Sequence, residues 1–122
     1  MKALLSAVFI FIFTVHPLLW AQGIAMFEAI KKNDQKMAQH LLLAGDNPNT
    51  KDPQGMTPLM YATLMNNPRM VELLLRNGSD DLLKTKGGET AMDFAVKNKY
   101  EKIIFLLRLH RQNIQNKTQA RK

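Results

Sequence analysis

Residues 57–62 read Thr-Pro-Leu-Met-Tyr-Ala, and a related stretch, Thr-Ala-Met-Asp-Phe-Ala, follows at 90–95. The two stretches are 33 residues apart, and one step earlier residues 24–29 read Ile-Ala-Met-Phe-Glu-Ala. Gly45 and Gly78 repeat with the same spacing. A fixed period of this length is typical of stacked repeats, in which each unit buries its apolar face against its neighbours. The sequence therefore predicts three units, near residues 22–54, 55–87 and 88–111.

Each unit carries the signals of two helices. In the middle unit, Thr57 and Asn67 are each followed by proline, the arrangement of an N-cap and the first position of a helix. Asn66 and Gly78 suit the left-handed conformation that ends a helix. In the first unit we expect helices near 25–32 and 35–44, and in the third near 90–98 and 101–111, the last able to continue to Ile114 before the polar tail frays.

The middle unit resembles an ankyrin repeat. The family pattern at the first helix is Thr-Pro-Leu-His-x-Ala, and residues 57–62 match it except at the histidine, which is Met60 here. Residues 46–55 resemble the family's hairpin segment, and 71–78 its second helix and stop. The resemblance covers residues 24–108 and implies an all-α fold: an ankyrin solenoid of three stacked helix-turn-helix repeats with short β-hairpin-like loops. The outer units depart further from the pattern, as capping repeats do.

The N-terminus has the layout of a secretory signal peptide. Lys2 supplies a positive start, residues 3–13 are apolar apart from Ser6, and Pro17 breaks the run. We expect cleavage after Ala21 and a periplasmic or secreted protein. The alternatives are an uncleaved membrane anchor and a buried core helix, although the uninterrupted apolar run is about half of the ~20 residues that a spanning helix needs.

The formal net charge is +7 at pH 7, and the excess of basic residues is concentrated near the C-terminus. The stretch 109–122 contains Arg111, Lys117, Arg121 and Lys122 and no acidic residue. We interpret residues 112–122 as a basic tail, either solvated or attracted to an anionic polymer, a lipid or an acidic partner. Because export is expected, nucleic acid is not an expected partner.

The sequence offers no recognisable catalytic site. It has no cysteine, which excludes disulfides and thiol catalysis and, with export, suggests a bacterial envelope compartment. His40 and His110 fall on two different second helices, and residues 80–81 and 87–88 are typical of turns. We therefore expect no enzyme activity, cofactor or metal. Four of the eight methionines fall on columns expected to be buried: Met26, Met37, Met70 and Met92.

The family resemblance also indicates a binding surface. Residues beside the hairpin turns and late in the first helices are expected to line a concave groove. Met56, Leu64 and Met65 would form its apolar centre, with lysines at the rim, the usual anatomy of a protein-binding site. The alternative is that these side chains pack into neighbouring repeats. The predicted partner-binding residues are Lys31, Lys32, Lys51, Pro53, Gln54, Met56, Leu64, Met65, Lys84, Lys86, Glu89, Lys97 and Asn98.

These features predict a non-enzymatic, protein-binding module in the bacterial envelope, monomeric when free and without a membrane span after signal cleavage. Its expected partner is a folded periplasmic or secreted enzyme, such as a cell-wall hydrolase, which it would inhibit or protect against. One alternative is a stabilising or assembly factor for an envelope enzyme. Another is a surface component that docks to anionic polymer or lipid through its basic tail.

Overall fold

The computed structural model describes residues 23–122, and within that range it contains helices and no strands. The predicted signal peptide, residues 1–21, lies outside the described residues. The first helical segment covers residues 23–31. The others are α2 (Gln35–Leu43), α3 (Pro58–Leu64), α4 (Pro68–Arg76), α5 (Ala91–Lys97) and α6 (Glu101–Ala120).

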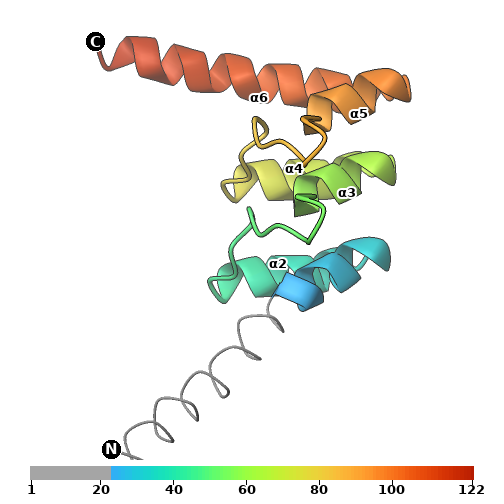
Figure 1. Cartoon of the computed structure of the whole chain (residues 1–122). Helices are drawn as coiled ribbons and strands as arrows, with labels where there is room; N and C mark the ends of the chain where they lie inside the picture. Colours follow the sequence, from blue (N-terminus) through green and yellow to red (C-terminus); the bar gives the residue numbers. More distant parts are fainter. Residues whose placement is uncertain (1–22) are drawn as a thin grey trace, which may run out of the picture.

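The helices form three stacked tiers (Figure 1). Segment 23–31 pairs with α2, α3 with α4, and α5 with α6, and an extended loop joins each pair to the next. Contacts run along the stack, from α3 to α5 and from α4 to α6, as well as within the pairs α3–α4 and α5–α6. This arrangement confirms the predicted all-α solenoid of helix-turn-helix repeats.

The predicted helix starts are confirmed by their hydrogen bonds. The Thr57 hydroxyl accepts a hydrogen bond from the Met60 N–H at 3.3 Å, and Asn67 accepts one from the Met70 N–H at 3.1 Å. Asp34 caps α2 in the same way, at 2.9 Å from the Met37 N–H. These bonds satisfy N–H groups that have no partner inside the helix.

The helix ends repeat with the same period. Asn33 and Asn66 end the first helices with φ of 55° and 50°, as expected for asparagine in the left-handed region. Lys99 holds the equivalent place in the third unit with φ of 59°, although nothing in a lysine favours this conformation. Gly78, at φ 90°, ends α4.

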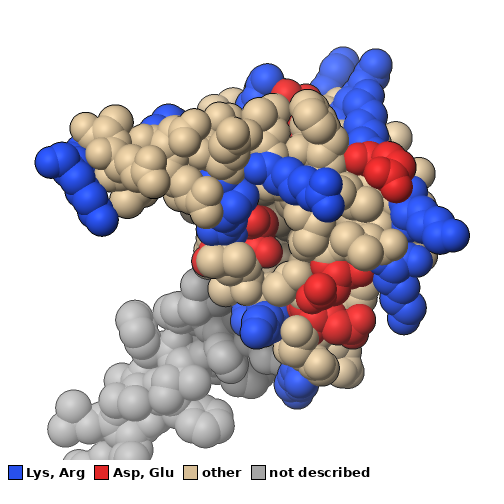
Figure 2. Space-filling model, turned by 90° about the horizontal axis from the view of Figure 1, so that it is seen from above, with Lys and Arg blue, Asp and Glu red and all other residues tan. Residues whose placement is uncertain are grey.

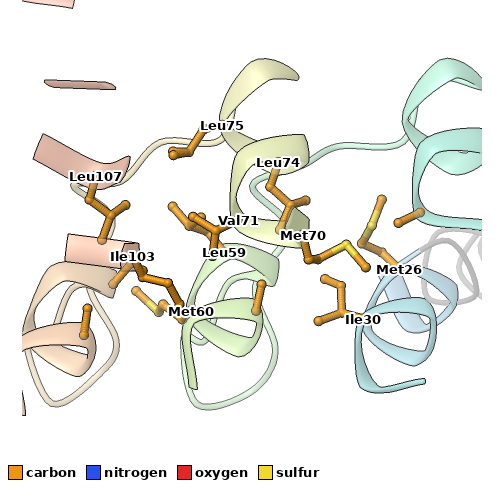
Figure 3. Packing of buried hydrophobic residues seen from close by; sticks show 14 of the residues in the cluster. Met26, Ile30, Leu59, Met60, Met70, Val71, Leu74, Leu75, Ile103 and Leu107 are labelled. Atoms are coloured by element: carbon orange, nitrogen blue, oxygen red, sulfur yellow. The ribbon is translucent and has the colours of Figure 1, made fainter. Parts of the chain in front are cut away.

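A continuous apolar core joins the tiers (Figure 3). Met26 and Ile30 from segment 23–31 meet α4, and the core continues to Ile103 and Leu107 of α6. Met60, which stands in place of the family histidine, is 1% exposed. Its sulfur accepts a hydrogen bond from the Thr57 N–H at 3.4 Å, so Met60 both fills the core and closes the cap.

Met37 corrects one prediction about the core. It is 47% exposed, whereas Met26 and Met70 are fully buried and Met92 is partly buried against the core. Met37 lies on α2, in the tier at the N-terminal end of the stack, so that no tier on that side covers it among residues 23–122. The repeat period therefore overestimated its burial.

The last helix is longer than predicted. α6 continues through Ala120, so the expected end near Arg111, or fraying after Ile114, is wrong. Position 111 is the repeat equivalent of Gly45 and Gly78, and arginine there does not favour the left-handed stop that glycine permits. Residues 112–120 are therefore helical and project beyond the other tiers (Figure 1).

Arg111 also has a fixed partner. It forms an ion pair with Asp81, whose side chain is only 11% exposed. Residue 81 lies in a turn, as predicted, but Asp81 is not solvated as a simple surface turn would be, because the pair links the middle of α6 to the loop that precedes α5. Within residues 23–122, no helix is both long and apolar enough to cross a membrane.

Candidate protein-binding face

We call the surface that carries the predicted partner-binding residues the inner face. It consists of the two hairpin turns, residues 51–56 and 84–89, and the C-terminal ends of the three first helices, residues 31–32, 64–65 and 97–98. Every predicted residue on it is exposed except Met56 and Glu89, which are partly buried.

The apolar centre of the inner face lies on α3 and the hairpin before it. Leu64 is 38% exposed and Met65 is 43% exposed. Met56 is partly buried and packs against the core. The alternative that all three side chains pack inside the repeats therefore holds in part for Met56 and not for the other two.

Asp52 fixes the hairpin that leads to this centre. One carboxylate oxygen accepts hydrogen bonds from the N–H groups of Gln54 and Met56, each at 2.9 Å. The other accepts a hydrogen bond from the Tyr61 hydroxyl at 2.6 Å, which ties the hairpin to α3. Burial raises the pKa of Asp52, but the hydrogen bonds from Tyr61, Met56 and Gln54 and the charge of Lys31 outweigh it, so the pKa is lowered. The hydrogen bond to Asp52, with burial and the negative charge, raises the pKa of Tyr61.

Tyr61 also connects the middle unit to the first. The Phe27 and Tyr61 rings meet edge to face, with centroids 5.2 Å apart. The Lys31 ammonium lies over the Tyr61 ring, 5.5 Å from its centroid. Sequence reasoning missed Tyr61 because it occupies the variable position of the Thr-Pro-Leu-His-x-Ala pattern. The available signal was an aromatic residue with a hydroxyl on the helix that follows Asp52.

One backbone hydrogen bond and one side-chain hydrogen bond hold the adjacent hairpins in register. The Lys86 N–H donates to the Gln54 carbonyl at 3.1 Å, and the Lys51 ammonium donates to the Lys84 carbonyl at 3.3 Å. Gly55, with φ of 80°, permits this approach, because a Cβ there would lie 3.0 Å from the Lys86 nitrogen. The two hairpins therefore present Lys51, Lys84 and Lys86 on one continuous edge.

Three of the acidic residues near the inner face, Asp52, Asp93 and Glu28, have partners within the chain, whereas the Glu89 carboxylate has no ion-pair partner among the described residues. Asp93 accepts hydrogen bonds from the N–H and the hydroxyl of Thr90, at 2.8 and 2.9 Å. These bonds, the backbone bond first, lower the pKa of Asp93. Glu28 lies 3.9 Å from the Lys32 ammonium. By contrast, no carboxylate of the described residues lies within ion-pair distance of Lys51, Lys84 or Lys97.

The described residues include no metal-binding cluster and form two hollows beside α6. Residues 23–122 contain no group of three or more histidine, aspartate or glutamate side chains that could hold a metal ion. His110 lines a hollow of about 370 Å³ between α4 and α6, with apolar and amide side chains and the Glu72–Arg76 ion pair. A second hollow, of about 300 Å³, lies on the other flank of α6, beside the Asp81–Arg111 pair.

Comparison with known proteins identifies the repeats. The family model for ankyrin repeats, in three copies, matches residues 26–118. Human 2-5A-dependent ribonuclease is 39% identical over 66 residues, which are 53% of this chain and 9% of that protein. Bovine ankyrin repeat family A protein 2 is 34% identical over 87 residues, 71% of this chain and 24% of that protein.

A solved ankyrin-repeat structure also resembles this chain. The crystal structure of the ankyrin repeat domain of Bcl-3, a member of the IkappaB protein family, superposes with a TM-score of 0.68 at 26% identity, covering 70% of this chain and 38% of that one. The chain thus matches about a tenth to a quarter of the length of the two curated relatives named above. From the family match and the three tiers of paired helices, the chain belongs to the ankyrin-repeat family.

Proposed function

We propose that this chain is a non-enzymatic module that binds a folded protein through its inner face. Ankyrin repeats are protein-interaction modules, and stacked repeats of this kind generally bind through an extended surface rather than a catalytic pocket. The observation that carries the proposal is the exposure of Leu64 and Met65 at the end of α3, with lysines on either side. Exposed apolar side chains within a polar rim are the anatomy of a protein-binding site.

The rigidity of the inner face supports this proposal. Asp52 orders the hairpin before Met56, and Tyr61 anchors that hairpin to the helix that carries Leu64 and Met65. A surface already held in its binding conformation loses less conformational entropy when a partner docks. The inner face therefore suits a folded partner better than it would if its hairpins were mobile.

The charge distribution indicates the chemistry of the partner. Lys51, Lys84 and Lys97 have no carboxylate within ion-pair distance among the described residues, whereas Asp52 and Asp93 are already hydrogen-bonded. A partner that presents carboxylates around an apolar side chain would complement this surface, and complementary charge mainly raises the association rate and the specificity.

The proposed location is the bacterial envelope, after removal of the N-terminal signal peptide. The sequence pattern of residues 1–21 and the absence of cysteine support it. There the chain would inhibit or protect against a periplasmic or secreted enzyme, such as a cell-wall hydrolase. If the captured enzyme instead loses activity or abundance when the chain is removed, the chain is a stabilising or assembly factor and the inhibitory role is wrong.

The inner face is tested by capture with matched variants. The chain is immobilised, exposed to envelope extract, and the retained protein is identified and then purified. The double variant Leu64→Ser/Met65→Ser should weaken binding of that protein at least tenfold. The matched control is Met37→Ser/Leu43→Ser, because Met37 and Leu43 are also exposed, at 47% and 77%, but lie on α2. Equal loss of binding in both double variants would reject the inner face as the site.

A further inference from the structure

The outward side of α6 combines exposed apolar and cationic side chains. Phe105 is 63% exposed and Leu109 is 41% exposed. Lys102, Phe105 and Leu109 are spaced at i, i+3 and i+7, which places them along one side of the helix. The buried residues Ile103 and Leu107 lie on the side that packs against the other tiers.

Basic residues flank this line of side chains. At 100° per residue, Arg108 and Lys117 fall on opposite sides of the line through Phe105 and Leu109. Both cations are exposed, and neither forms an ion pair with a described residue. Lys117, like Leu109, borders the hollow between α4 and α6, and Arg108 borders the hollow beside the Asp81–Arg111 pair. Glu101 is the last acidic residue of the chain, so that the projecting half of α6 carries only positive charge. Figure 2 shows this arm with basic side chains at its tip and no acidic side chain along its visible length.

The position of α6 leaves this side accessible. α6 belongs to the last tier, and the first two tiers lie on its other side (Figure 1). Residues 112–120 are all exposed and still helical. A straight helix of 20 residues is about 30 Å long, so it can lie along a flat surface over its whole length.

We infer that this outward side of α6, which carries Lys102, Phe105 and Leu109 and is flanked by Arg108 and Lys117, docks the protein onto an anionic lipid surface. An interfacial helix buries aromatic and aliphatic side chains at the boundary between headgroups and acyl chains, while lysine and arginine reach the phosphates. Each basic residue near an anionic bilayer strengthens binding about fivefold. The phosphates of a nucleic acid would also attract the basic residues, but Phe105 and Leu109 would then face a polar groove.

This inference is independent of the inner face, because none of its residues belongs to that face. A chain docked through α6 would keep Leu64 and Met65 for a protein partner. The two surfaces would together concentrate the module at a membrane, although residues 23–122 contain no helix able to span one.

Vesicle sedimentation tests the inference. The full chain and its variants, all with the same N-terminus so that residues 1–21 contribute equally, are mixed with vesicles of phosphatidylcholine alone or with 30% phosphatidylglycerol. We expect the parent to bind the anionic vesicles at least tenfold more tightly, and the difference to shrink as salt is raised. Arg108→Gln/Lys117→Gln should weaken anionic binding about 25-fold, since each basic residue contributes about fivefold. Phe105→Gln should weaken it about fivefold or more, because a buried aromatic side chain is lost.

Matched controls distinguish an effect of the α6 surface from a general effect of lower net charge or lower surface hydrophobicity. Lys36→Gln/Arg69→Gln removes the same charge from exposed sites on α2 and α4, and Leu82→Gln removes a side chain that is 59% exposed in a loop. Both controls should bind like the parent. The inference is overturned if the controls weaken binding as much as the α6 variants, if the parent does not prefer anionic vesicles, or if a DNA duplex at equal phosphate concentration binds more tightly than the vesicles. Thermal unfolding of every variant confirms that the repeats remain folded.

Discussion

Two leucines on adjacent helices of the middle unit have different predicted roles, and truncating each to alanine separates them. Leu74 of α4 is fully buried, and Leu64 of α3 is 38% exposed. Leu74→Ala removes side-chain atoms from the core that joins the tiers and leaves a cavity. Buried leucine-to-alanine changes cost about 2.7–5 kcal/mol.

The same reasoning gives a smaller loss of stability for Leu64→Ala, because Leu64 is less buried than Leu74. The change removes three carbon groups, each contributing about 0.8 kcal/mol when fully buried, and only about 60% of the side chain is covered. The expected loss is about 1–1.5 kcal/mol, with no closed cavity. Since a domain of this size has a free energy of unfolding of about 5–15 kcal/mol, Leu64→Ala should remain folded at 25 °C, and Leu74→Ala should remain folded when the parent's free energy of unfolding exceeds the loss of about 2.7–5 kcal/mol.

Urea denaturation followed by circular dichroism measures the difference. We expect the midpoint to fall about twice as far or more in Leu74→Ala as in Leu64→Ala, with the slope of the transition unchanged. Partner binding should show the reverse order, with Leu64→Ala the weaker binder. Equal destabilisation by the two changes would refute the division between a buried stacking core and an exposed inner face.

Three other perturbations test separate parts of the structure. Asp52→Asn should flatten the pH dependence of stability. Because the pKa of Asp52 is lowered in the folded state, its stabilising contribution is present above the unfolded-state pKa and is lost as the pH falls through the folded-state pKa, which urea midpoints between pH 3 and pH 7 would detect. An unchanged pH profile would contradict the Tyr61–Asp52 link. Arg111→Gly should shorten α6 and reduce the helical circular dichroism signal, whereas Arg111→Ala should keep the helix; equal signals would mean that the residue at this position does not decide helix length. Intact mass spectrometry of the chain exported from a bacterial host should give a mature protein beginning within a few residues of Gln22, and retention of Met1 would exclude cleavage.

The local features of the fold were predictable from the sequence. Thr57 and Asn67 cap helices because their side chains bond to N–H groups three residues ahead, which spacing alone reveals. Asn66 and Gly78 take positive φ for equally local reasons. Repetition with the same period then identified three units, and the family resemblance supplied their stacking.

Two of the errors, at Asp81 and at Met37, involve contacts that no local pattern shows. The length of α6 is associated with arginine at a glycine position, and the partner of Arg111 is Asp81, 30 residues earlier in the chain. Met37 lies in a repeat column that is buried only where another tier covers it. For Met37 the missing information was the position of its unit at an end of the stack, whereas the absence of glycine at position 111 was visible in the sequence.

The candidate site was predictable only in outline. Residue positions transferred from the family pattern fall on accessible surface, yet the hydrogen bonds that order this surface pass through Tyr61, at a position where the pattern specifies no residue. The identity of the partner depends on a surface outside this chain, and a repeat fold is shared by proteins with unrelated roles.

Methyl NMR of the methionines tests the central claim most directly. In a chain labelled with ¹³C-methyl methionine, the captured partner should shift or broaden the signals of Met56 and Met65 on the inner face. The signals of Met37, exposed on α2, and of Met26 and Met70, fully buried, should remain at their original positions. Perturbation of Met37 while Met56 and Met65 remain unchanged would contradict binding through the inner face.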